Sequence, residues 1–351
     1  MTGSTSLYVG EMEAFEIDRD NIIPESVLSR LSSSGLFGPY TGAESAVKIL
    51  ESVRALARRS VGLASVVLIN MSVQFLVYHV LGYKETPLLQ RILDHGISAV
   101  SLTEKGGGTD LARNITVAAE ESGGEYCLRG EKVFTSNGLY ADYFLVLALD
   151  KGEPGLFVSD DRKSMEIEAL DLSSFRGAGI ARVVYNCARA VKITESKAMK
   201  TVLQAINLGR LGYTAIGIGI AEGSLEDALE YTRERKVFER PLIDYQGIQW
   251  MLADTYSRLE TVKALYRQAL QGLPSINPVQ AAVLKNEAAR LAQEAAWVNI
   301  QVHGGRGLEH HSRPERLYRD ARALDIGEGA REILKSFIAS SLARNPGLAT
   351  M

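Results

Sequence analysis

The sequence predicts an α+β multidomain protein with an N-terminal helical domain (residues 1–96), a central antiparallel β-barrel or sandwich (97–197) and a C-terminal four-helix bundle (198–351). Two observations predict this order. Apolar residues recur with a helical period before residue 96 and again after about residue 200, and between these regions they alternate with period two. The chain has 351 residues, 46% of them apolar, which is enough for two or three domains with buried cores.

The first region contains four predicted helices. Pro24 precedes an apolar-periodic run, so a helix is expected to begin there and to end near Gly35. Two longer helices are predicted at residues 43–59 and 64–81, and a short amphipathic one at 87–95. The most apolar stretch, residues 65–82, also carries polar side chains, so we expect a buried helix there and not a membrane span.

The middle region consists of short runs with strand-like alternation. Glycine-rich and Asp/Ser turns separate these runs, and no helical pattern lies between them, so an antiparallel arrangement is expected and a parallel βαβ sheet is not. The predicted strands are residues 97–102, 115–119, 126–134, 143–149, 155–158 and 181–185.

The last region returns to long helical patterns. Long helices that are joined by short loops predict an antiparallel bundle. The glycine-rich run at 217–223 superficially resembles a dinucleotide-binding motif, but it lies inside a helical pattern, so close helix packing is the better interpretation. The predicted helices are residues 201–236, 248–262, 278–302 and 328–343.

Composition narrows the possible partners and the location. The net charge of −3 and the pI near 6.1 give no reason to expect nucleic acid or an anionic membrane surface as a partner. Cys127 and Cys187 are too few for a disulfide framework, and we expect buried thiols. No secretory signal is visible, so a cytoplasmic protein is expected. The histidines 303, 310 and 311 lack ligands at suitable spacing, and no metal is expected.

Glu328 is the strongest single candidate for chemistry. It lies between Gly327 and Gly329, just ahead of a helical run. Small neighbours allow a ligand to approach closely, and a carboxylate in a sheltered site can act as a general base. The alternative is an acidic residue that stabilises a helix N-terminus through the helix dipole.

Two further segments have the residue types of a binding site. Residues 102–110 place a run of three glycines after a strand, and the backbone N–H groups of such a run can hold a pyrophosphate; a glycine-rich hairpin turn is the alternative. Residues 130–138 end in Asn137-Gly138, a turn signal, and carry Phe134 and Ser136 just before it. A core phenylalanine in a hairpin is the alternative for this segment.

Four segments in the correct order closely resemble signatures of the acyl-CoA dehydrogenase family: residues 102–110, 130–138, 233–246 and 301–328. The resemblance covers nearly the whole chain and implies the same three-part fold. The sequence departs from the family pattern at Lys105, Asn207 and Glu239, where proline, aspartate and glycine are usual. It is also shorter than is usual in the family before Ala43. This difference is expected to change the upper wall of an acyl pocket and not the flavin site.

The resemblance implies an FAD-dependent enzyme. Glu328 would remove the α-proton of an acyl thioester, the β-hydride would pass to the flavin, and a trans-2-enoyl thioester would form. The acyl group would be carried by CoA or by an acyl-carrier protein. Electrons would leave to an electron-transfer flavoprotein. The implied cofactor contacts are Leu102, Thr103, Gly108, Thr109, Phe134, Ser136, Arg235, Phe238, Gln246, Gln301, Gly304 and Gly305.

The contacts at residues 235–246 and 301–305 would reach the FAD of a neighbouring subunit, so the resemblance implies a homo-oligomer, either a tetramer or a dimer. The implied substrate contacts are Thr109, Asn207, Arg210 and Gly327. A bulky aromatic residue often stands at the place of Gly327, so we expect a wider pocket beside the base. Some family members carry the base directly before the arginine that matches Arg210, but Gly209 stands there, which leaves Glu328 for this role.

Two other functional hypotheses remain open. The same scaffold could act on a carrier-protein-bound acyl group or as a flavin monooxygenase in a biosynthetic pathway, although Glu328 argues against a monooxygenase. The chain could also be a non-catalytic flavin-binding scaffold, because function depends on the site and not on the fold.

Overall fold

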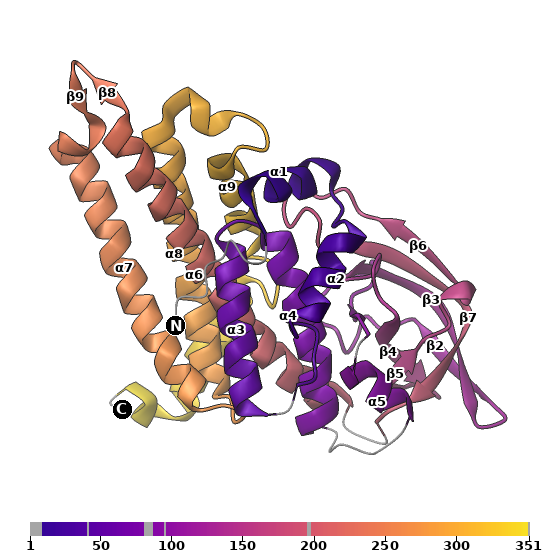
Figure 1. Cartoon of the computed structure of the whole chain (residues 1–351). Helices are drawn as coiled ribbons and strands as arrows, with labels where there is room; N and C mark the ends of the chain where they lie inside the picture. Colours follow the sequence, from indigo (N-terminus) through magenta and orange to yellow (C-terminus); the bar gives the residue numbers. More distant parts are fainter. Residues whose placement is uncertain (1–8, 41, 81–86, 95, 195–197, 350–351) are drawn as a thin grey trace.

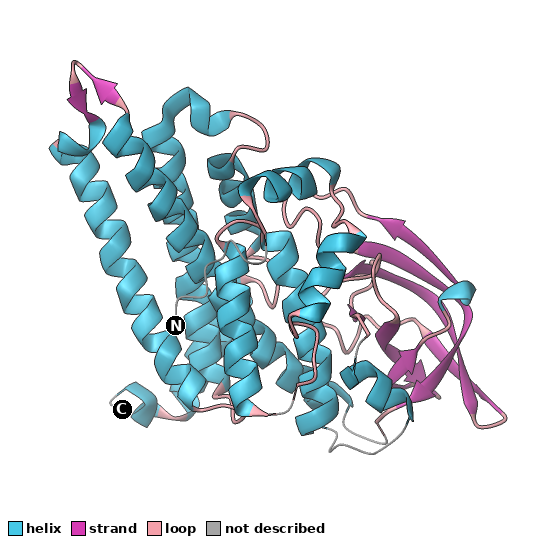
Figure 2. Ribbon diagram, in the orientation of Figure 1, coloured by secondary structure: helices cyan, strands magenta, loops and turns pink. Residues whose placement is uncertain are grey.

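The computed structural model describes residues 9–40, 42–80, 87–94, 96–194 and 198–349. A helical bundle lies on one side of the molecule, a barrel of strands lies on the other, and the N-terminal helices lie between them (Figure 1). Figure 2 shows the same division by secondary structure, with only one small hairpin of strands at the tip of the bundle. The predicted fold class is confirmed in this order of helices, strands and helices.

The N-terminal region contains one helix more than predicted. The extra helix, α1, is mostly polar and has no strong apolar stripe. The predicted ends at Leu81 and His95, like the domain boundary at 197, fall outside the described residues. The elements are α1 (Glu11–Asp20), α2 (Glu25–Ser33), α3 (Ala43–Ala57), α4 (Val61–Phe75), a π-helical turn (Leu76–Val80) and α5 (Pro87–Asp94).

Helix α4 forms the centre of the N-terminal region. The stretch Val61–Tyr78 is long and apolar enough to cross a membrane, but 94% of it is buried inside the protein. Its polar side chains are satisfied internally: Asn70 donates to the Phe37 carbonyl (2.8 Å) and accepts from the Ser98 N–H (2.8 Å), and Gln74 donates to the Phe37 carbonyl (2.6 Å). Buried polar groups need such partners, so this is a core helix, as expected.

The strands form a closed but mixed sheet. The order is β1-β4-β2-β3-β7-β5, and β4 also pairs with β5, which closes a barrel. The β1–β4 and β2–β4 pairings are parallel, whereas an antiparallel sheet was expected. The strands are β1 (Ser98–Ser101), β2 (Ala118–Ser122), β3 (Glu125–Thr135), β4 (Tyr143–Asp150), β5 (Glu153–Ser159), β6 (Met165–Ala169) and β7 (Ala181–Lys192).

Two differences from the expected barrel have physical reasons. Alternation within a strand reports which face is buried but not which strand is its neighbour, so the direction of pairing was open. Strand β6 pairs with β7 off the main path and has no fully buried residue; its short apolar face, with Met165 and Ile167, is only partly buried against the barrel core.

The cysteines form a disulfide, and the expectation of buried thiols was wrong. Cys127 on β3 and Cys187 on β7 are bonded, and their Cα atoms lie 4.6 Å apart. The pairing of β3 and β7 shifts register next to these residues, and Cys187 has a φ of 62°, as at a β-bulge. The bulge places the two side chains together. A register shift between strands that are 60 residues apart cannot be read from the sequence.

The C-terminal region is a bundle of long helices with an additional shorter one, α9. The glycines near 220 pack closely, as predicted: a Cβ at Gly219 would lie 2.3 Å from the Arg54 carbonyl oxygen on α3. The elements are α6 (Ala198–Glu234), the hairpin β8 (Lys236–Val237) and β9 (Arg240–Pro241), α7 (Gln246–Gln271), α8 (Pro278–His303), α9 (Arg313–Ala323) and α10 (Arg331–Arg344). Short 3-10 turns lie at Leu242–Asp244, Gly304–Leu308 and Pro346–Ala349.

Candidate active site

Glu328 lies in the loop between α9 and α10. The sequence predicted a helix from residue 328, but α10 begins at Arg331, and Glu328 has a left-handed φ of 55°. Non-glycine residues rarely adopt this conformation, and where they do the strain often serves a site. Glu328 is therefore not a helix N-terminal acid. Its side chain is directed by the loop against α6.

The Glu328 loop packs against one face of α6. Gly209 lies three residues after Ile206 and four before Tyr213, and Arg210 lies three before Tyr213, so these side chains share one side of the helix. A Cβ at Gly209 would lie 2.6 Å from Cδ and Oε2 of Glu328. The absence of a side chain at 209 thus provides the space that the Glu328 carboxyl group occupies. The sequence linked these two positions, and the structure places them in contact.

Positive groups surround this carboxyl group. Burial raises the pKa of Glu328 to about 7, while Arg210 and Lys285 oppose the shift. Arg210 on α6 donates from Nε to the Glu328 carbonyl oxygen (3.3 Å) and from Nη1 to Oδ1 of Asn207 (2.8 Å). A carboxyl group with a pKa near neutrality can accept and release a proton at physiological pH.

Gly327 does not widen the space beside the base, contrary to expectation. A Cβ at Gly327 would lie 2.3 Å from the hydroxyl oxygen of Tyr213, so the tyrosine ring on α6 fills this place. That ring stacks on Phe175, with centroids 5.8 Å apart. Burial, followed by the charge of Glu328, raises the pKa of Tyr213. An aromatic side chain therefore lies beside the base, but it comes from a helix residue that the sequence did not single out.

The contact between Tyr213 and Gly327 can be tested by stability. We expect Gly327→Ala to lower the free energy of unfolding by about 1–3 kcal/mol, because the added methyl group overpacks against the tyrosine. The same change should cost clearly less in a Tyr213→Leu background. Urea unfolding of the four proteins of this cycle measures the coupling. An equal cost in both backgrounds would show that the two residues do not compete for this space.

A narrow, mostly apolar cavity of about 40 Å³ reaches the Glu328 carboxyl group. It lies between α4 with its π-helical turn, α6 and the barrel, so all three regions of the fold contribute to it. The sequence did not identify most of its lining, since apolar residues on three separate elements look like ordinary core. The lining residues are Ile69, Ser72, Leu76, Val100, Leu102, Leu145, Val202, Ala205, Ile206 and Glu328.

The barrel contributes four predicted cofactor contacts at one edge. The Val133 N–H donates to the Thr103 carbonyl (2.9 Å), and Val100 and Ser136 exchange two backbone hydrogen bonds (3.2 Å each). These bonds place Leu102 and Thr103 beside Phe134 and Ser136. The Phe134 side chain is 56% exposed, so its ring is available as a flat surface and is not the core residue of the alternative hypothesis.

The glycine-rich loop at residues 104–110 is anchored to the barrel by a buried ion pair that the sequence did not reveal. Glu104 accepts from Lys132 Nζ (2.7 Å) and from the backbone N–H groups of Thr116 (2.8 Å) and Val117 (3.1 Å). Burial acts to raise the pKa of Glu104, but the hydrogen bonds and the charge of Lys132 together outweigh burial, so the pKa lies below its usual value. Among the described residues, the N–H groups of Gly108 and Thr109 have no hydrogen-bond acceptor. They are free to bind an anion.

The remaining predicted contacts form a second group at the far end of the bundle. Arg235 and Phe238 belong to the β8–β9 region, and Phe238 is 89% exposed. His303, at the end of α8, stacks on Tyr231 in the last turns of α6 (4.1 Å between centroids), so Gln246, Gln301, Gly304 and Gly305 lie at this same end. From Gly209 to Arg235 the helix rise is about 40 Å. A single chain does not bring the two groups together.

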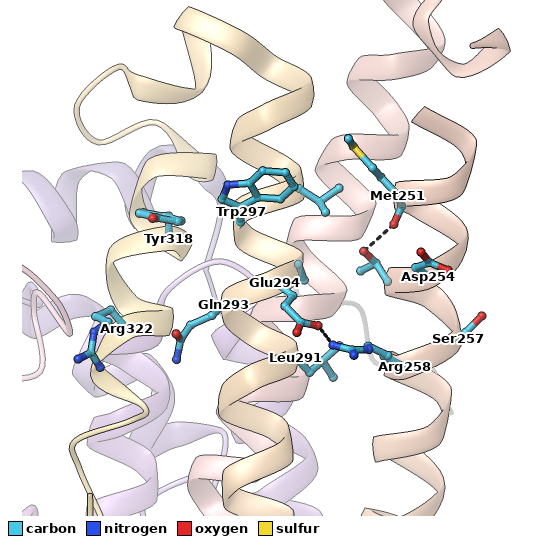
Figure 3. A pocket seen from close by; sticks show the side chains of 13 residues that line it. Met251, Asp254, Ser257, Arg258, Leu291, Gln293, Glu294, Trp297, Tyr318 and Arg322 are labelled. Carbon is cyan, nitrogen blue, oxygen red and sulfur yellow. Dashed lines mark hydrogen bonds and ion pairs between the residues drawn. The ribbon is translucent and has the colours of Figure 1, made fainter. Parts of the chain in front are cut away.

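A separate groove of about 870 Å³ runs along the outside of the bundle. Figure 3 shows it between α7, which carries Met251 and Arg258, α8, which carries Trp297 and Glu294, and α9, which carries Tyr318. An ion pair between Arg258 and Glu294 bridges its floor. Trp297 and Tyr318 are 48% and 46% exposed, which is high for large aromatic side chains.

Comparisons with known proteins match both the barrel and the bundle. The model of the acyl-CoA dehydrogenase C-terminal domain matches residues 199–343, and that of the middle domain matches 99–187. A cyclohexane-1-carbonyl-CoA dehydrogenase of Geobacter metallireducens is 30% identical across 94% of this chain and 92% of that protein. The caffeyl-CoA reductase-Etf complex subunit CarC of Acetobacterium woodii is 27% identical across 70% of this chain and 68% of that protein.

The solved structure of butyryl-CoA dehydrogenase from Megasphaera elsdenii has the same fold. Its TM-score is 0.85 at 24% identity, and the superposition covers 98% of this chain and 99% of that one. The two domain models span the barrel and the bundle, and the Geobacter relative is similar over most of its length. The chain therefore belongs to the acyl-CoA dehydrogenase family of oxidoreductases.

Proposed function

We propose that this protein catalyses the FAD-dependent α,β-dehydrogenation of an acyl-CoA and that Glu328 is the base. The observation that carries the proposal is the place of the Glu328 carboxyl group. It lies in the space left by Gly209, and Glu328 lines a mostly apolar cavity whose lining also includes Leu102 from the barrel region. At about 40 Å³ the cavity must widen to admit a thioester, which would then have its α-carbon beside the base and its β-carbon toward the barrel.

The chain supplies two functions to such a reaction. The carboxylate of Glu328 takes the α-proton, and the electron pair of that C–H bond enters the new double bond. The backbone N–H of Glu328 has no acceptor among the described residues, so it is free to donate to the thioester carbonyl oxygen. A donor at this place stabilises the negative charge that develops on the oxygen and makes the α-proton more acidic.

The residues at the barrel edge fit FAD. The exposed Phe134 ring offers a surface for a flat ring system, Thr103 and Ser136 offer hydroxyl groups, and the free N–H groups of Gly108 and Thr109 suit a phosphate. Gly107 has a φ of 113° and open space around it, so a ligand can approach the loop closely. When bound, FAD supplies the acceptor for the hydride that leaves the β-carbon. Its reduced form would be reoxidised by an electron-transfer flavoprotein, as the name of the Acetobacterium relative suggests.

We also propose that the protein is a homo-oligomer. One group of predicted FAD contacts lies at the barrel and the other beyond the far end of α6, which is about 40 Å along the helix from Gly209 beside the base, so we infer that one cofactor contacts both only if they come from two chains. The groove lined by Trp297 and Tyr318 is a further surface that assembly would cover. Light scattering during gel filtration should give a mass of two or four times 38.3 kDa, and Trp297→Glu should reduce it. A monomer at micromolar concentration would contradict this proposal.

A second candidate function is the reverse reaction, the reduction of a 2-enoyl-CoA. The near-neutral pKa of Glu328 is compatible with both directions, because a carboxyl group of this pKa can take a proton from the α-carbon and can also return one to it. The Acetobacterium relative is named as a reductase and the Geobacter relative as a dehydrogenase. The direction in the cell would then depend on the electron partner.

The proposed function is tested by the colour of the purified protein. It should be yellow, and under anaerobic conditions the flavin absorbance should fade when the right acyl-CoA is added. A panel from short straight-chain to branched, cyclic and aromatic acyl-CoAs would identify the acyl group. A colourless protein that does not take up FAD would support the scaffold hypothesis. Fading with NAD(P)H alone would support a monooxygenase, and fading only with acyl-carrier-protein thioesters would identify a carrier-protein substrate.

A further inference from the structure

A lysine is buried beneath the Glu328 loop. Lys285 lies on α8 and is 1% exposed. Its Nζ donates to the carbonyl oxygen of Gly329 at 2.7 Å, in the residue that follows Glu328. Within the described residues, no carboxylate lies within ion-pair distance of this ammonium group, although lysine is rarely fully buried without a partner. The cost of burying the charge therefore calls for an explanation.

The charged and titratable groups around the Glu328 loop come from four segments of the chain. Arg210 and the hydroxyl of Tyr213 face it from α6, Lys285 from α8, Asp325 from the segment after α9, and Arg331 from the first turn of α10. Arg331 already pairs with Asp325 at 2.5 Å. Burial lowers the pKa of Lys285 to about 8, while Asp325 and Glu328 act to raise it. The ammonium charge is thus compensated in part by the base itself.

We propose that Lys285 is a positioning residue for the base: it fixes the loop through the Gly329 carbonyl and, as a cation, favours the ionised form of the Glu328 carboxyl group. The first effect holds a left-handed backbone in which the base points at Gly209. The second keeps the carboxyl group able to accept a proton although it is taken out of water. The inference rests on the proposed role of Glu328.

The two effects can be separated by three substitutions. Lys285→Met removes both the donor and the charge. Lys285→Gln keeps a donor within reach of the Gly329 carbonyl but removes the charge, and it carries the test if the methionine variant does not fold. Lys285→Arg keeps the charge. Arg290→Met is the matched control, because Arg290 is an exposed cation on the same helix that pairs with Glu287 (3.5 Å) and not with the Glu328 loop.

The first readout is the protonation of Glu328 itself. Infrared spectra of protein with ¹³C-labelled glutamate are recorded from pH 5 to 9, and the Glu328→Gln spectrum is subtracted to isolate this carboxyl group. The midpoint in the unmodified protein is expected near pH 7. In Lys285→Met and Lys285→Gln it should rise by at least about one pH unit, since a nearby opposite charge changes a carboxyl pKa by roughly that much or more. Lys285→Arg and Arg290→Met should stay near the original midpoint.

The second readout is the pH dependence of flavin reduction by an acyl-CoA. Its midpoint should move upward with the infrared midpoint in the methionine and glutamine variants. A purely structural role for Lys285 would lower the rate at every pH and leave both midpoints in place, and that result would overturn the proposal. If no acyl-CoA reduces the flavin of the unmodified protein, the proposed function fails, while the infrared titration still decides the role of Lys285.

Discussion

Glu328→Gln is expected to lower the rate of flavin reduction by an acyl-CoA by about 10²- to 10⁴-fold, the range that a positioned general base contributes. Glutamine has nearly the shape of glutamate, so it should still fit the space at Gly209, but its amide cannot take up the α-proton. FAD should remain bound, because no cofactor contact is proposed for the Glu328 side chain. Anaerobic stopped-flow absorbance gives the rate, and the flavin spectrum gives the occupancy.

A matched control for this change lies four residues away. Glu332 is an exposed acid in the first turn of α10, and Glu332→Gln removes the same charge without touching the cavity. Its rate should stay within a factor of about two, because an exposed charge contributes little energetically. Equal loss in both variants would assign the effect to net charge or to stability. Full activity in Glu328→Gln would remove Glu328 from the role of base.

Gly209→Ala should lower the same rate by about 10- to 100-fold, because displacing a reacting group by even about 1 Å is costly. The new Cβ would lie 2.6 Å from the Glu328 carboxyl group, and this group is the movable end of a side chain. The base would therefore be displaced while the backbone stays in place. Alanine is also the better helix former, so the free energy of unfolding should not fall.

Gly217→Ala is the contrasting change on the same helix. A Cβ at this position would lie 2.8 Å from the carbonyl oxygen of Ala288, which is backbone and cannot turn aside. We expect Gly217→Ala to lower the midpoint of thermal unfolding and to spare the rate of the protein that remains folded. The proposed packing of base against Gly209 would be wrong if Gly209→Ala gave the Gly217→Ala result, with stability lost and the rate per folded molecule unchanged.

The order of helices and strands was accessible from the sequence because each element has a periodic apolar pattern. Helices α3, α6 and α8 lie close to their predicted ranges. The elements that were missed give a weaker signal: α1 and α9 are rich in charged residues, and β6 alternates over only five residues, none of them fully buried. Helix α9 buries Arg316 and Asp320 among its core residues, a choice of side chains that no periodicity rule anticipates.

The candidate site was accessible only in part, for a similar reason. Glu328 was identified from its glycine neighbours and from the family resemblance, and the exclusion of Gly209 as the base came from that resemblance. Lys285 and Tyr213 matter because of what they contact across the bundle, and a single lysine or tyrosine in a helical run gives no indication of that contact. The disulfide between Cys127 and Cys187 required a register shift between two strands, which is a tertiary property.

Exchange of the α-protons tests the role of Glu328 most directly. An acyl-CoA with sulfur in place of the β-carbon has no β-hydride to lose, so proton removal can be observed without oxidation. Incubated in D₂O with the FAD-loaded protein and followed by proton NMR, the α-protons should be replaced by deuterium, and Glu328→Gln should abolish the exchange. Exchange at an unchanged rate in Glu328→Gln would show that another group removes the proton.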